Sequence, residues 1–147
     1  MSTGRAGEGR LRAADSGLYR SADARALAPV PAAGLDVVPI RLAGVANKDA
    51  LLERFASALE FPDWFGGNWD ALEDCLGDLS WRPQGDRVLL IEGFESLALV
   101  SHDDFRVLLD LLADVAEHWS AQGRAFVVLF LDPEHKLGLR PWGDAPA

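Results

Sequence analysis

Short apolar runs alternate with segments of helical periodicity through the middle of the chain. The apolar runs cover residues 37–42, 88–92 and 125–131, and each has the length of a β-strand. Pro39 has no amide proton, so the first run belongs at a sheet edge or begins at Ile40. The last run is uninterrupted, which is typical of a central buried strand. This alternation predicts a small α/β domain.

Three segments between these runs have the spacing of amphipathic helices. They begin after Asn47, Asn68 and Ser101, whose side chains can cap a helix N-terminus. Ser101 and Asp104, three residues later, have the pattern of a capping box, and Gly123 is the expected end of the third helix. The predicted apolar faces consist of Leu51, Leu52, Phe55 and Leu59; Trp69, Leu72, Cys75, Leu76 and Leu79; and Phe105, Leu108, Leu109, Leu112, Val115, Ala116 and Trp119.

The two ends of the chain lack this regularity. We expect residues 1–15 to be disordered, residues 17–20 could add a short strand, and residues 22–27 could form a helical turn. The segment from Glu134 onward is expected to be irregular. The predicted division is an N-terminal extension at 1–35, partly disordered, one domain at 36–132 and an irregular tail at 133–147.

Acidic residues are concentrated in the predicted domain. The net charge of −9 is distributed as +2 over residues 1–35, −11 over residues 36–132 and zero over residues 133–147. Such a field repels nucleic acid phosphates and anionic membranes and attracts basic surfaces, so we expect neither nucleic acid nor a membrane as partner. Acidity also promotes solubility, so only a local pattern gives it functional meaning.

The cysteine content and the N-terminal residues indicate a cytoplasmic protein. Cys75 is the single cysteine, which excludes an internal disulfide and a CxxC metal or redox pair. Residues 1–12 are polar and lack the apolar stretch of a signal peptide, and no run of about 18 apolar residues occurs.

The segment at residues 61–81, FPDWFGGNWDALEDCLGDLSW, combines an acidic helix face with flanking aromatics. Asp70, Asp74 and Asp78 follow each other at four-residue spacing opposite the apolar stripe, and like charges at that spacing destabilise a helix. Trp64, Phe65 and Trp81 lie outside the stripe, although Phe65 also suits the core. A solvated surface face is one interpretation; because Trp is enriched in binding hot spots, a protein-binding surface is the other.

The sequence FPDWFGGNWDALEDCL resembles the signature segment of the barstar family, and the similarity extends over about residues 36–132. The resemblance implies a three-stranded parallel sheet packed on three to four helices. It also implies inhibition of a secreted microbial ribonuclease inside the producing cell, without a cofactor or metal. The family's inhibitory aromatic falls on Trp64, and its two helix carboxylates fall on Asp70 and Asp74.

The chain departs from the family pattern at three positions. Glu73 and Leu79 replace aromatics of the best-known member, with Trp81 two residues after Leu79. A further carboxylate of the last helix would fall on His118, next to Glu117. The predicted binding surface, for a 1:1 complex with the ribonuclease, comprises Trp64, Phe65, Gly66, Gly67, Asn68, Asp70, Glu73, Asp74, Gly77, Asp78, Trp81 and Glu117.

Asp74 is the residue we expect in the phosphate position of the ribonuclease, because a rigid carboxylate can hydrogen-bond the cations that hold RNA phosphate. Asp70 and Glu73 would meet the rim of that pocket. An immunity protein or adaptor with the same fold and another basic toxin as its partner is the alternative.

An enzyme is the rival class of function. It would use Asp70 and Asp74 with one of the histidines at 102, 118 and 135. The sequence contains no GxxxxGK, HExxH, GxSxG or paired CxxC motif to accompany them, so we expect no catalytic activity.

Overall fold

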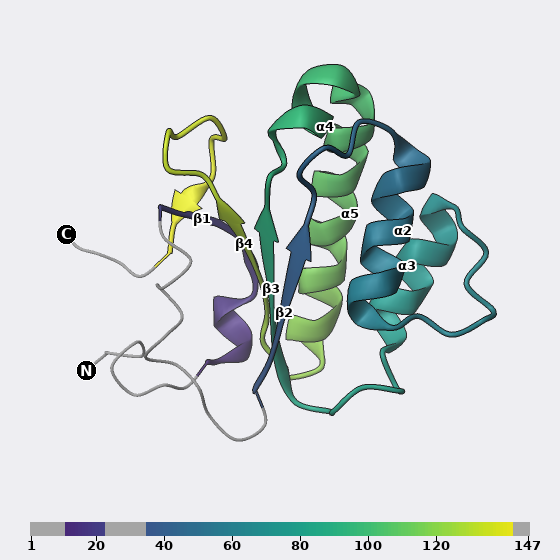
Figure 1. Ribbon diagram of the computed structural model, residues 1–147. Helices are drawn as coiled ribbons and strands as arrows, with labels where there is room; N and C mark the ends of the chain where they lie inside the picture. Colours follow the sequence, from purple (N-terminus) through teal and green to yellow (C-terminus); the bar gives the residue numbers. More distant parts are fainter. Residues whose placement is uncertain (1–10, 23–34, 143–147) are drawn as a thin grey trace.

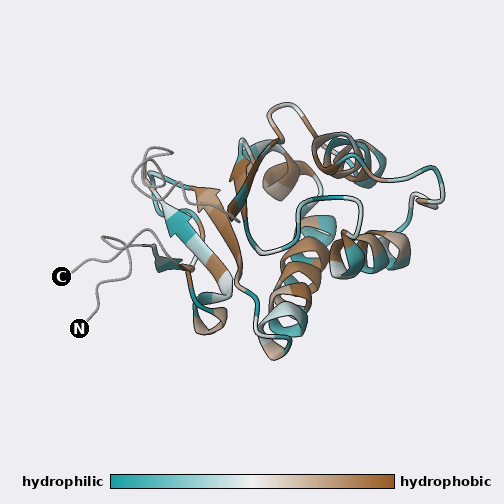
Figure 2. Cartoon of the chain, turned by 90° about the horizontal axis from the view of Figure 1, so that it is seen from below, coloured by the Kyte–Doolittle hydropathy of each residue, from teal (hydrophilic) through white to brown (hydrophobic). Residues whose placement is uncertain are grey.

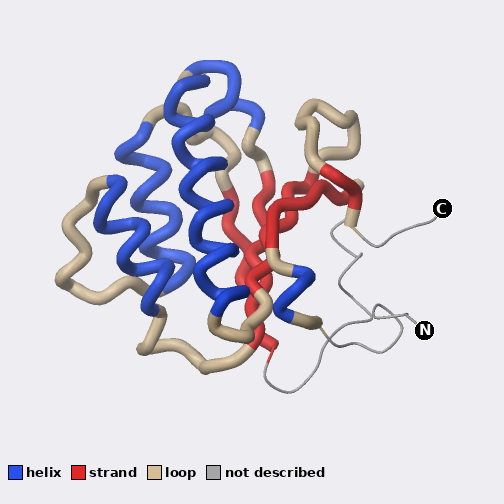
Figure 3. The backbone as a smooth tube through the Cα atoms, turned by 180° about the vertical axis from the view of Figure 1, so that it is seen from behind, coloured by secondary structure: helices blue, strands red, loops and turns tan. Residues whose placement is uncertain are grey.

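Among the residues that the structure describes, four α-helices cover one face of a five-stranded parallel sheet (Figures 1 and 3). The computed structural model describes residues 11–22 and 35–142. In chain order the elements are the 3-10 helix η1 (Ala13–Asp15), β1 (Gly17–Ser21), β2 (Leu35–Arg41), α2 (Lys48–Leu59), α3 (Trp69–Asp78), β3 (Asp86–Glu92), α4 (Glu95–Val100), α5 (His102–Ala121), β4 (Phe126–Leu131) and β5 (Arg140–Pro141).

The strand order is β2-β3-β4-β1-β5, and all neighbouring strands pair in parallel. As predicted, β2 with Pro39 is an edge strand and β4 is central and almost wholly buried. The prediction of three strands is wrong, because the segments before and after the predicted domain each add a strand, β1 and β5. Strand β1 pairs along its whole length with β4, from Gly17 opposite Val127 to Ser21 opposite Leu131, and Arg140 in β5 pairs with Tyr19. Two residues of β5 are too short for any periodicity to predict.

The predicted helices form where expected, with one wrong cap. The side chains of Asn47 and Asn68 accept hydrogen bonds from the backbone amides of Ala50 and Ala71, at 2.9 and 2.8 Å. Ser101 makes no side-chain cap, since the unpredicted helix α4 ends there. Its hydroxyl instead donates to the carbonyl of Ala46 at 2.8 Å and ties the start of α5 to the loop before α2.

Apolar residues form a core on each face of the sheet. In Figure 2 the central strands are brown and the helices carry both brown and teal. The larger core lies between the sheet and the helices and includes Ile40, Phe55, Leu76, Phe94, Leu112 and Phe130. The second core comprises Leu11, Tyr19, Val88, Leu90, Ala125, Val127 and Leu129. No helix in the described part of the chain is long and apolar enough to span a membrane.

The second core corrects the prediction of disorder for residues 11–15. Leu11 is buried, and the carboxylate of Asp15 accepts a hydrogen bond from the amide of Arg12 at 2.8 Å. The Tyr19 hydroxyl donates to the carbonyl of Asp15 at 2.7 Å. The prediction failed because an apolar contact from one isolated residue leaves no periodic signal. Residues 1–10, and 23–27 of the suggested helical turn, lie outside the described residues.

The tail after β4 is also more ordered than predicted. The buried carboxylate of Asp132 accepts from the amides of Lys136 and Leu137, both at 2.8 Å. These bonds turn the chain back toward the sheet, where β5 adds to β1 and Trp142 packs edge-on against Tyr19.

Candidate functional site

Helix α3 has one apolar face and one acidic face, as predicted. Leu72, Cys75 and Leu76 are fully buried against the core. The carboxylates predicted for the binding surface, Asp70, Glu73, Asp74 and Asp78, are all exposed. The buried face holds the helix against α5 and the larger core, so the carboxylates project from a fixed support.

An open groove lies between α3 and α5 and has a volume of about 350 Å³. Four carboxylates and one imidazole contribute to its walls, which makes it a site for a cationic group rather than an anion. We call it the acidic groove; its lining consists of Glu73, Asp74, Gly77 and Asp78 from α3 and Asp114, Val115 and His118 from α5.

The α5 wall differs from the sequence prediction. Asp114 was not predicted, although its position four residues before His118 puts both on the same side of the helix. Glu117 is exposed but is not part of the groove lining, so its contact with a partner stays a prediction. The His118 ring stacks edge-on with Trp119 and would lie 3.8 Å from a methyl group at Gly77. Its Nε2 is 3.1 Å from Nε2 of Gln122.

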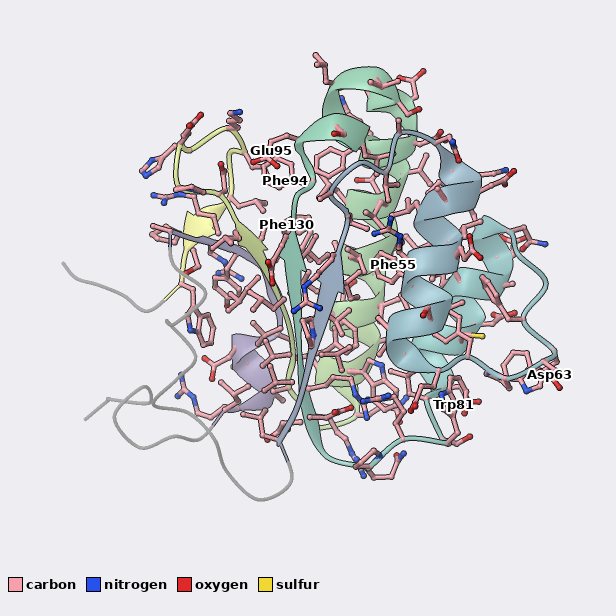
Figure 4. All side chains as sticks on the ribbon, viewed as in Figure 1. Phe55, Asp63, Trp81, Phe94, Glu95 and Phe130 are labelled. Carbon is pink, nitrogen blue, oxygen red and sulfur yellow. The ribbon has the colours of Figure 1, made fainter. Side chains whose placement is uncertain are left out.

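Four aromatic rings gather where the loop before α3, residues 61–68, meets the loop that follows α3. We call Phe61, Trp64, Phe65 and Trp81 the aromatic cluster. Their rings meet edge-on, with centroids 4.9 Å apart for Phe61 and Phe65 and 6.0 Å apart for Trp81 with both Phe61 and Trp64. Phe65 and Trp81 pack partly buried against the core, whereas Trp64 is 57% exposed. Figure 4 shows Trp81 and the neighbouring loop residue Asp63 at the same end of the helical layer.

A glycine turn connects the aromatic cluster to the acidic helix. Gly67 has a φ of 72°, which is costly for a residue with a side chain. Gly66, Gly67 and Asn68 are all exposed, and Asn68 then caps α3. The turn therefore places an exposed tryptophan and an exposed acidic helix on consecutive parts of the chain.

The ionic surroundings of Cys75 follow from the same helix. Burial raises the pKa of its thiol to about 11, and the charges of Asp74 and Asp78 act in the same direction. A thiol of this kind is a weak nucleophile, because the thiolate is the reactive form. Within residues 11–22 and 35–142, no three His, Cys, Asp or Glu side chains come together as a metal site.

Four charged residues next to the aromatic cluster form ion pairs with one another. We call them the ion cluster: Asp36, Glu60, Arg82 and Arg87. Arg82 donates to both carboxylate oxygens of Asp36, from Nε at 2.9 Å and from Nη2 at 3.0 Å. Arg87 donates to the same carboxylate from Nε at 3.0 Å. Burial opposes the ionisation of Asp36, but the hydrogen bonds and charges of the two arginines together outweigh it and lower its pKa.

Comparison with protein families matches residues 35–131 to the family described as Barstar (barnase inhibitor). No curated protein matches the chain. The matched range contains both walls of the acidic groove, the aromatic cluster and the ion cluster, and it leaves β1 and β5 outside.

Proposed function

Because this chain belongs to the barstar family, we propose that it inhibits a secreted microbial ribonuclease by covering the active site of that enzyme with the acidic groove and the aromatic cluster. The observation that carries the proposal is the groove, in which carboxylates from two helices face a single opening. We propose that the complex is 1:1 and forms inside the producing cell, before the ribonuclease is secreted.

The chemistry of ribonucleases supports this assignment. An enzyme that cleaves RNA holds a phosphate with arginine, lysine and histidine, so its active site is a positive pocket. A carboxylate can occupy the phosphate position and accept charge-assisted hydrogen bonds from the same cations. The −11 charge of residues 36–132 also favours encounter with a basic surface.

Within the groove, we assign the phosphate position to Asp74. It lines the groove and lies in the middle of α3, between Asp70 one turn before and Asp78 one turn after. Asp70 and Glu73 would meet the rim of the ribonuclease pocket, and Asp114 adds a carboxylate from the opposite wall. Trp64 offers an exposed aromatic surface for the rest of the interface.

The barstar family is a family of inhibitors, and we propose that this chain likewise has no hydrolase activity of its own. Its carboxylates are then ligands for cations of the partner rather than acids and bases. RNA cleavage that survives repurification and disappears in Asp74→Ala would contradict this.

The experiment that tests the function mixes the purified protein with barnase and a panel of other secreted microbial ribonucleases and measures residual RNA cleavage. We expect at least one ribonuclease to be inhibited at equimolar ratio, and Asp74→Ala to lose most of the inhibition. Glu53→Ala is the matched control, since it removes one exposed charge from α2 outside the groove. Equal inhibition by wild type and Asp74→Ala would contradict the assignment of the groove.

One observation favours a second candidate, an immunity protein against a different basic toxin. His118 lies on the α5 wall at the position where the family resemblance places a carboxylate, so this wall differs from the family pattern in charge. A protein that inhibits none of the ribonucleases but binds another basic toxin through Asp74 would support this candidate instead.

A further inference from the structure

The ion cluster joins three separate parts of the chain at one loop. Asp36 belongs to β2, Glu60 follows α2, and Arg87 belongs to β3. Arg82, in the loop after α3, reaches the first two: its Nη1 lies 3.1 Å from Glu60, in addition to its two bonds to Asp36. The side chains of Asp36, Arg82 and Arg87 are only 13%, 14% and 3% exposed, so water screens this cluster far less than a surface pair.

The loop that carries Arg82 is also held by its own hydrogen bonds. The amide of Arg82 donates to the carbonyl of Leu79 at 3.1 Å, and Nε2 of Gln84 donates to the carbonyls of Leu79 and Arg82 at 3.1 and 2.9 Å. Arg87 donates from Nη2 to the carbonyl of Pro83 at 2.6 Å. Residues 79–84 are therefore fixed relative to the sheet by the two arginines.

Trp81 lies directly before Arg82, so the bonds that hold Arg82 also restrict the position of Trp81 within the aromatic cluster. Its indole nitrogen donates to the carbonyl of Leu59 at 2.9 Å, which sets the orientation of the ring. That ring meets Trp64 edge-on, with an interplanar angle of 86°. Within the described residues, this is the one aromatic contact recorded for Trp64, whose side chain is otherwise largely exposed.

We propose that Asp36 and Arg82 are positioning residues for the binding surface: they fix Trp81 and, through its ring, hold Trp64 in the orientation that meets the partner. The role in binding rests on the proposed function, whereas the positioning rests on the contacts alone. A side chain that is ordered before binding loses less conformational entropy on association, so this arrangement strengthens binding without touching the partner.

The first test concerns the free protein and needs no partner. Asp36→Asn keeps the shape of the side chain but leaves the two arginines facing a neutral group. We expect amide hydrogen exchange in residues 61–67 and 79–84 to become at least fivefold faster, while exchange in β4 changes only as far as global stability does. Unchanged exchange in residues 61–67 would overturn the proposal.

Asp15→Asn is the matched control, because Asp15 is another buried carboxylate that accepts hydrogen bonds, in η1 against the opposite face of the sheet. We expect this variant to lose stability without any local effect on residues 61–67. If Asp15→Asn accelerates exchange there as much as Asp36→Asn, the effect is general destabilisation and the positioning role is wrong.

The second test is a double-mutant cycle with the most strongly inhibited ribonuclease of the panel. We expect Asp36→Asn to weaken binding five- to twentyfold in the wild-type background and less than twofold in Trp64→Ala, because the first substitution acts through the second residue. Equal effects in both backgrounds would overturn the proposal. If no ribonuclease binds, the proposed function fails, and hydrogen exchange alone decides whether Asp36 positions Trp64.

Discussion

At the scale of single residues, three carboxylates of one helix lie at four-residue spacing in different surroundings. Asp70 is in the first turn of α3, Asp74 and Asp78 line the acidic groove, and Asp78 also accepts a hydrogen bond from the Ser80 hydroxyl at 3.3 Å. Mutual repulsion is a small cost to folding, of about a few tenths of a kcal/mol for each pair. The binding role that we propose for these residues and the stability of the helix therefore favour opposite changes in charge.

Asp74→Ala should weaken binding without lowering stability. It removes repulsion with Asp70 and Asp78, so the free energy of unfolding should stay level or rise by about a few tenths of a kcal/mol. Binding should weaken by more than about 2 kcal/mol, because cations of the partner lose their carboxylate. Urea unfolding and affinity measurements check the two effects; a large loss of stability would contradict the exposed placement of Asp74.

Cys75 should be unreactive in the folded protein. Its side chain is fully buried and its pKa is raised to about 11, so about one thiol in a thousand would be ionised at pH 8. We expect labelling by a thiol reagent at pH 8 to follow the urea unfolding curve. Rapid labelling of the native protein would show that the apolar face of α3 opens without global unfolding.

The Asp36 carboxylate should make stability sensitive to acid. Since its pKa in the folded protein lies below the ordinary value of 3.8, its contribution is complete above that value and disappears as pH falls through the lowered pKa. Wild type should exceed Asp36→Asn in stability by a constant amount from pH 5 to pH 8, about 2 kcal/mol as for hydrogen bonds to charged groups, and the difference should shrink below pH 4. Unfolding midpoints across this range measure it; a difference that persists unchanged at pH 2 would contradict the ion pairing.

At the scale of elements, the long periodic segments were predictable, β1 was suggested at residues 17–20, and α4 and β5 were not predicted. Helices α2, α3 and α5 and strands β2, β3 and β4 each extend over enough residues to show their spacing in the sequence. The elements α4 and β5 are too short to show a spacing in the sequence, and β1 and β5 depend on partner strands far away in the chain.

The same distinction applies to the candidate site. The α3 wall was predictable because its carboxylates share one helix face. The α5 wall was not, since periodicity does not say which exposed face of α5 meets α3, and Asp114 was missed for that reason. The ion cluster was missed because Asp36 and Arg82 are 46 positions apart and meet only in the folded protein.

The two asparagine caps allow a matched comparison of helices. Asn47→Ala and Asn68→Ala should each cost about 1 kcal/mol of stability, because each leaves one amide of a first helical turn without its acceptor. Only Asn68→Ala should weaken ribonuclease binding, since α3 carries the acidic face. Thermal unfolding and affinity measurements decide this, and equal binding losses would show that the effect is not local to α3.

At the scale of the whole molecule, the sheet has helices on one face and the second core on the other. The family match ends at residue 131, so Trp142 and β5 lie beyond it, and Leu11 and β1 lie before its start at residue 35. Strands β1 and β5 widen the sheet, and Leu11 and Trp142 belong to the second core, on the face away from the acidic groove.

Leu11→Ala should lower stability without changing ribonuclease binding. Leu11 is buried in the second core, and loss of its side chain should cost about 2 kcal/mol or more. Ribonuclease binding by the folded variant should be unchanged, because the substitution lies across the sheet from the acidic groove. Urea unfolding and affinity give both values, and an unchanged unfolding midpoint would contradict the burial of Leu11.

The position of β4 in the sheet has a consequence for the time at which the protein becomes active. Strand β1 is synthesised first, but its partner β4 comes 110 positions later, and β4 also separates β1 from β3. At typical translation rates the 110 positions between Gly17 and Val127 take roughly 6 to 22 seconds to synthesise. The central strand emerges only near the end of that interval, and α5, the second wall of the groove, shortly before it. Until both have emerged, the nascent chain has neither the partner strand of β1 nor the second wall of the groove.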